Sequence, residues 1–208
     1  LKKQAGNFSD FTAGYVIKSD KRNRRFMPTD GHIISFKQNL PVFADSPSIR
    51  NTISLKNYHS FSENLVGTVK FYGSAITGLD DEDVRLSKRI NLPRTLLRGF
   101  EAGKVGPRDG FDYVGGNYAS AINFEASLPN LLPDATETDI SLFWDLANLW
   151  HVDYSEDVDD SNKIRSSVGL ATNMYTPVGP LSFVIAQNIS KADTDKTQIF
   201  NFQIGTSF

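Results

Sequence analysis

The feature that most constrains this chain is an alternation of apolar and polar residues that recurs in segment after segment. It is clearest at the end of the chain, where one face carries Phe200, Phe202, Ile204, Thr206 and Phe208 and the other carries Asn201, Gln203, Gly205 and Ser207. A period of two residues is typical of a β-strand with one apolar and one polar face. Further segments with this pattern lie at about 11–18, 32–39, 49–57, 65–76, 117–126, 139–148, 163–175 and 181–188. We therefore predict an all-β protein of about nine strands.

The polar faces of these segments help to separate a membrane barrel from a soluble β-sandwich. A sandwich exposes its polar face to water and should carry dense charge there. The polar faces of these segments carry few charged residues, with Asn123 near Glu125 and Ser141 near Asp145. Each segment is also close to the roughly 9–11 residues that cross a bilayer when tilted. Large aromatic residues are placed near predicted strand ends, as in an interfacial girdle: Tyr118, Trp144, Tyr175 and Phe208. The residues favour an antiparallel transmembrane β-barrel, with a soluble β-sandwich binding module as the alternative.

Composition excludes several other classes. The chain has 22 Lys and Arg against 24 Asp and Glu, so its net charge of −2 argues against nucleic acid as a partner. It has no cysteine, which excludes disulfides and thiolate metal sites. Its three histidines are scattered, and no nucleophile signature is visible. We expect no metal, no cofactor and no enzymatic activity.

The connections between the segments differ in length. Short turns with Pro or Gly are predicted at 27–31, 128–134 and 176–180, alternating with longer acidic loops, as in a barrel with short periplasmic turns. The largest connection, about 77–116, contains Leu97, Arg98, Gly99 and Phe100. An arginine between bulky apolar residues and a glycine is suited to a loop tip that folds into a barrel lumen.

These four residues resemble the Val/Leu-Arg-Gly-Phe tip of the sixth outer loop of the outer-membrane barrel assembly proteins, the BamA family. Other blocks match that family in order, at 28–31 (Pro-Thr-Asp-Gly), 114–117 (Val-Gly-Gly-Asn), 143–145 (Phe-Trp-Asp), 179–181 and 200–208. The resemblance implies that residues 1–208 are the C-terminal part, about nine strands, of a sixteen-stranded barrel. The family's periplasmic repeats and first barrel strands would be absent. It also implies an integral location in the outer membrane of a Gram-negative bacterium.

The function implied by the resemblance is the assembly and insertion of β-barrel proteins by strand pairing at a lateral gate. The gate strand and terminal signal would be Phe200, Phe202, Ile204, Gly205 and Phe208. Implied partners are unfolded β-barrel clients, accessory lipoproteins and outer-membrane lipid. A related secretion translocator and a passive solute channel remain alternatives.

The same resemblance suggests partners for Arg98. Counting along the predicted strands places Glu125 and Asp145 on the lumen side of neighbouring strands. The long loop begins and ends beside these strands, and the family pairs its loop arginine with the matching acidic positions. We therefore expect Arg98 to lie between Glu125 and Asp145, the alternative being a solvated loop arginine.

Overall fold

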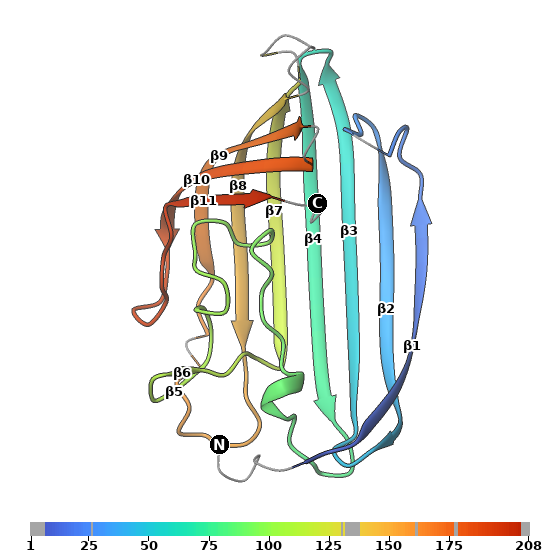
Figure 1. Ribbon diagram of the computed structural model, residues 1–208, viewed down its shortest axis with the longest axis vertical. Coiled ribbons are helices and arrows are strands. Elements are labelled where there is room, and N and C mark those ends of the chain that lie inside the picture. Colours follow the sequence, from blue (N-terminus) through green and yellow to red (C-terminus); the bar gives the residue numbers. More distant parts are fainter. Residues whose placement is uncertain are drawn as a thin grey trace.

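A computed structural model describes residues 7–25, 27–129, 131, 138–160, 162–176 and 179–204, with backbone only at 175, 176, 179 and 180. The described residues form one large antiparallel sheet of nine strands, in which each strand pairs with the next strand of that sheet along the chain. Its nine strands are β1 (Asp10–Asp20), β2 (Gly31–Ala44), β3 (Ser48–Ser62), β4 (Leu65–Gly78), β7 (Tyr118–Leu128), β8 (Thr138–Trp150), β9 (Arg165–Thr176), β10 (Gly179–Ser190) and β11 (Phe200–Ile204). The sheet is strongly curved, with β1 and β11 at its edges (Figure 1). Each predicted alternating segment corresponds to one strand, so the predicted all-β antiparallel fold is confirmed.

The two faces of the sheet have the polarity of a membrane barrel. The inner face buries polar side chains completely, among them Asn123, Ser141, Asp145 and Ser167. The outer face exposes large apolar side chains: Ile122, Phe124, Leu142, Trp144, Leu170 and Ile185. A soluble sandwich would bury its apolar face against a second sheet, and here the long connection after β4 covers the polar inner face instead. The sandwich alternative is therefore wrong. In the described part of the chain, no helix is long and apolar enough to span a bilayer.

The connection between β4 and β7 lies on the concave side of the sheet. It contains a short 3₁₀ helix, η2 (Leu86–Lys88), and a two-stranded hairpin, β5 (Arg108–Asp109) and β6 (Asp112–Tyr113). Figure 1 shows this connection rising alongside β7 and β8. It packs a buried apolar cluster against the inner face, consisting of Ile76, Val84, Ile90, Leu92, Leu97, Phe100, Val105, Ala119, Ala121, Ala147 and Leu149. The small alanines of β7 and β8 leave room for the loop, as predicted for a loop folded into the lumen.

Two details of the prediction are wrong. Trp144 lies in the middle of β8 and not near its end, so its exposed ring belongs to the outer apolar band and not to a girdle. The strict alternation of short and long connections also fails, because the first connection spans 21–30 whereas the second spans only 45–47. Within the first connection, the Asn23 Oδ1 accepts hydrogen bonds from the backbone N–H groups of Thr29 (3.2 Å) and Asp30 (3.3 Å), which join the two ends of this connection.

Candidate functional site

The tip of the long loop is fixed by the residues on either side of Arg98. Leu97 and Phe100 are buried in the loop's apolar cluster. Gly99 adopts a φ of +85°, and a Cβ added there would lie 2.9 Å from the Cβ of Ala186. Because only glycine adopts this backbone without strain and without that clash, the loop can turn tightly against β10. Asn188 of β10 donates a hydrogen bond to the Gly99 carbonyl at 3.0 Å.

This turn directs Arg98 at two carboxylates on neighbouring strands. Its Nε and Nη2 donate to both oxygens of Asp145, at 2.8 and 2.7 Å, and its backbone N–H donates to the same carboxylate at 3.0 Å. Its Nη1 donates to Glu125 at 3.4 Å. The Asp145 side chain is fully buried, whereas those of Arg98 and Glu125 are 11% and 10% exposed. The contacts predicted for Arg98 are therefore present, with the planar two-pronged geometry that only a guanidinium offers.

An aromatic ring supports the guanidinium from one side. The Arg98 Cζ lies 3.6 Å from the centroid of the Phe143 ring, which is a close cation–π contact. Gly169 makes room for this ring, because a Cβ there would lie 2.8 Å from the Phe143 Cζ and 2.1 Å from the Ile185 carbonyl oxygen. Phe143 and Asp145 lie two residues apart on β8, so the alternation of the strand presents the ring and the carboxylate to the same arginine.

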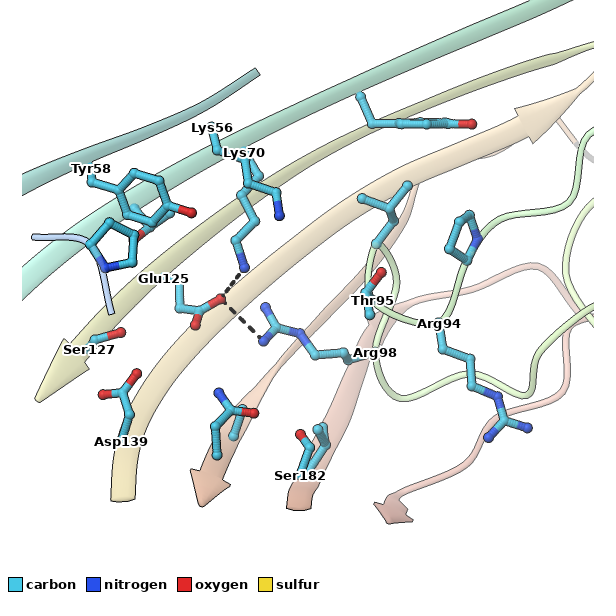
Figure 2. A pocket seen from close by; sticks show the side chains of 18 of the residues that line it. Lys56, Tyr58, Lys70, Arg94, Thr95, Arg98, Glu125, Ser127, Asp139 and Ser182 are labelled. Atoms are coloured by element: carbon cyan, nitrogen blue, oxygen red, sulfur yellow. Dashed lines mark hydrogen bonds and ion pairs between the residues drawn. The ribbon is translucent and has the colours of Figure 1, made fainter. Parts of the chain in front are cut away.

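Two further residues of the site were not predicted from the sequence. Lys70 of β4 donates to the Glu125 carboxylate at 2.7 Å, and Figure 2 shows Lys70 and Arg98 converging on Glu125. Asn123 donates to Asp145 at 2.8 Å and to the Leu96 carbonyl at 2.9 Å, which ties the loop to β7. The sequence does contain a signal for Lys70 as a site residue, because Lys70 is a charged residue on the inward face of a predicted strand.

The ion-pair cluster borders a cavity of about 940 Å³ on the concave side. Lys56, Lys70, Arg94 and Asp139 line this cavity together with residues of the loop tip (Figure 2). Within the described ranges, no group of three His, Asp or Glu side chains is placed to hold a metal ion. The arrangement anchors the loop by charge pairing.

The predicted gate strand is only partly described. β11 pairs with β10 from Leu181 opposite Ile204 to Ile185 opposite Phe200. Phe200, Phe202 and Ile204 alternate with Asn201 and Gln203, which line the cavity, so the predicted faces are correct over this stretch. Gly205 and Phe208 lie outside the described residues.

A single antiparallel sheet with an apolar outer face, a polar inner face and an arginine-anchored loop on its inner side defines part of a transmembrane β-barrel. The model of the Omp85 superfamily domain matches residues 1–208, and the chain belongs to that superfamily. It is accordingly an integral outer-membrane protein of Gram-negative bacteria.

Individual relatives agree with this assignment. The chain is 26% identical over 213 residues to "Outer membrane protein assembly factor BamA" of Neorickettsia risticii (strain Illinois), a match that covers 100% of this chain and 29% of the relative. It is 29% identical over 141 residues to the protein of the same name from Neisseria meningitidis serogroup B, covering 54% of this chain and 17% of that protein. The crystal structure of BamA from Haemophilus ducreyi lacking POTRA domains 1–3 has the same fold. Its TM-score is 0.84 at 23% identity, over 94% of this chain and 42% of that one. The chain thus spans less than a third of the length of these curated relatives.

Proposed function

We propose that the protein containing this chain assembles β-barrel proteins and inserts them into the outer membrane. The names of the two curated relatives support this role. The proposed reaction is non-enzymatic and needs no cofactor, since it exchanges backbone hydrogen bonds and makes no covalent bond. Its partners are unfolded β-barrel clients, with accessory lipoproteins and outer-membrane lipid around the complex.

The observation that supports the proposed mechanism is the position of β11 at one edge of the described sheet, the other edge being β1. β11 is paired on one side only within the described sheet, over the five residues Phe200–Ile204. An unpaired backbone edge is unfavourable in lipid, because its N–H and C=O groups have no water to bind. An incoming client strand satisfies these groups by β-augmentation, so β11 is proposed as one side of a lateral gate.

The test uses two outward-facing residues of nearly equal exposure. Phe202 on β11 is 43% exposed and Ile53 on the interior strand β3 is 42% exposed. A photo-crosslinking amino acid is placed at one or the other in the whole protein, and a radiolabelled β-barrel client is then assembled in vesicles. We expect client crosslinks at Phe202 and few at Ile53, because β11 lies at an edge of the described sheet whereas β3 is paired on both sides.

The same experiment separates the alternatives. Equal crosslinking at both positions would contradict strand pairing at β11. A client that crosslinks and then appears unfolded outside the vesicle would indicate a secretion translocator. Ion conductance with no client crosslink at either position would indicate a passive solute channel.

A further inference from the structure

A second buried ion pair lies apart from the Arg98 site. Arg165, the first residue of β9, donates from Nε to Asp195 at 2.9 Å and from Nη2 to the other carboxylate oxygen at 3.2 Å. Both side chains are completely buried. Asp195 belongs to the loop between β10 and β11, so the pair ties this loop to the barrel wall. A buried charge pair is stable only where its remaining hydrogen-bonding groups also find partners.

Those partners come from four different parts of the chain. Arg165 Nη1 donates to Asn148 of β8 at 2.9 Å and to the Lys163 carbonyl before β9 at 2.9 Å. The Asp195 carboxylate accepts the backbone N–H of Ala192 at 2.7 Å, within its own loop. It also accepts the backbone N–H of Gly106 at 3.4 Å, from the long loop. Asp195 is therefore a shared acceptor for the long loop and the loop that leads into β11.

Backbone pairing joins the same two loops next to the ion pair. The Glu101 N–H donates to the Lys196 carbonyl at 3.0 Å, and the Lys196 N–H donates to the Lys104 carbonyl at 3.0 Å. The Gln198 N–H donates to the Gly99 carbonyl, also at 3.0 Å. The segment 99–104 of the long loop thus pairs antiparallel with 196–198, directly before β11 begins at Phe200.

We propose that Arg165 and Asp195 form a latch that makes the tip of the long loop and the last strand move as one unit. In the described residues, β11 pairs with β10 over Phe200–Ile204, and the segment directly before Phe200 leads into this pairing and helps to set its position. That segment is held by 99–104, and 99–104 begins at the turn beside Arg98. Arg165 is a positioning residue in this scheme, since it acts through Asp195. The role of the latch in client insertion rests on the proposed function of β11, whereas the coupling itself does not.

Hydrogen exchange of the whole protein, read by mass spectrometry in nanodiscs, tests the coupling. Asp195→Asn keeps the side-chain volume but removes the carboxylate charge that faces Arg165. We expect exchange to accelerate on the order of tenfold or more in 99–106 and in 196–204 together, with the interior strands β3 and β4 unchanged. Arg98→Ala, which perturbs the other end of the loop tip, should also accelerate exchange in 196–204, because coupling between two sites is reciprocal.

The matched control is Asp153→Asn, in the connection between β8 and β9, where Asp153 contacts the base of the long loop. Asp153 also accepts from a buried arginine, Arg89, at 3.2 Å, and from the Val84 N–H at 2.8 Å. This control should accelerate exchange around Val84 and leave 196–204 at the wild-type rate. Acceleration in 196–204 that is no greater for Asp195→Asn and Arg98→Ala than for Asp153→Asn would overturn the latch.

A second variant covers the case in which Asp195→Asn does not fold. Arg165→Met combined with Asp195→Leu removes both charges and fills the space with apolar groups, which proteins often tolerate. The hydrogen bond to Gly106 is lost, so 99–106 and 196–204 should again exchange faster together. A wild-type exchange pattern in the folded double variant would also overturn the proposal. Client insertion is measured separately: faster exchange with normal insertion would leave the latch standing and count against β11 as the gate.

Discussion

Replacing Arg98 by alanine should release the tip of the long loop. The change removes the only cation that contacts the buried Asp145 carboxylate in the described structure. The carboxylate then keeps hydrogen bonds from the Asn123 side chain and from the backbone N–H of residue 98. Loss of one partner of a buried pair costs on the order of 3–5 kcal/mol. Glu125 keeps its bond to Lys70, so the lower end applies here, about 3 kcal/mol. Since about 1.4 kcal/mol is a factor of ten, the tip should open about 100-fold more often.

Chymotrypsin cleavage within the long loop measures this opening. Phe100, at the tip, is 4% exposed and is cut only when the loop opens, whereas Phe111 is 91% exposed and is cut in the closed state. When opening is fast relative to cleavage, the rate follows the open population. We expect Arg98→Ala to raise cleavage at Phe100 by about 100-fold relative to cleavage at Phe111. Arg98→Lys should restore protection in part, because lysine carries the charge without the planar fork.

The control is Arg94→Ala in the same loop. Arg94 is exposed and forms no ion pair among the described residues, so its removal should cost well under about 1 kcal/mol. Equal cleavage at Phe100 in the Arg98→Ala and Arg94→Ala proteins would refute the reasoning. The loop would then be held by its apolar contacts alone.

The remaining predictions use the same ratio, that of chymotrypsin cleavage at Phe100 to chymotrypsin cleavage at Phe111. Lys70→Ala should raise it less than Arg98→Ala does, since Glu125 keeps Arg98 at 3.4 Å; an equal or larger rise would place the main charge contact at Lys70. Phe143→Leu removes a cation–π contact of roughly 0.5–2 kcal/mol, so the ratio should rise by about 2- to 30-fold, and no change would show that the ring contributes nothing. Gly99→Ala forces a left-handed backbone at about 1–2 kcal/mol in addition to the clash at the tip, so the ratio should rise at least several-fold, and wild-type protection would contradict the strain argument.

The strands and their faces could be predicted because both depend on local sequence. Alternation of side chains along one strand is a property of the backbone, so Asn123 and Glu125 on β7 share a face whatever the rest of the chain does. The outward position of Phe200, Phe202 and Ile204 follows from the same period. Trp144 was misplaced because alternation shows which face a residue occupies, while strand ends depend on where pairing with neighbours stops.

The pairing of Arg98 needed more than alternation. Counting along the strands showed that Glu125 and Asp145 point inward, and the family resemblance supplied the arginine. The sequence alone did not show that Phe143 would stack on the guanidinium, because the ring reaches Arg98 only where Gly169 leaves space. A contact of this kind depends on the register of β8 against β9, which sets Phe143 opposite Gly169.

What the sequence by itself determined is therefore the fold class, the two faces of each strand and the unusual length of the connection after β4. Only the tertiary structure decided how that connection runs through the concave side and what it contacts there. Lys70 with Glu125, and Arg165 with Asp195, are separated by 55 and 30 residues. Such pairs form because the curved sheet brings distant strands and loops to one interior, where a buried charge is stable only beside an opposite one.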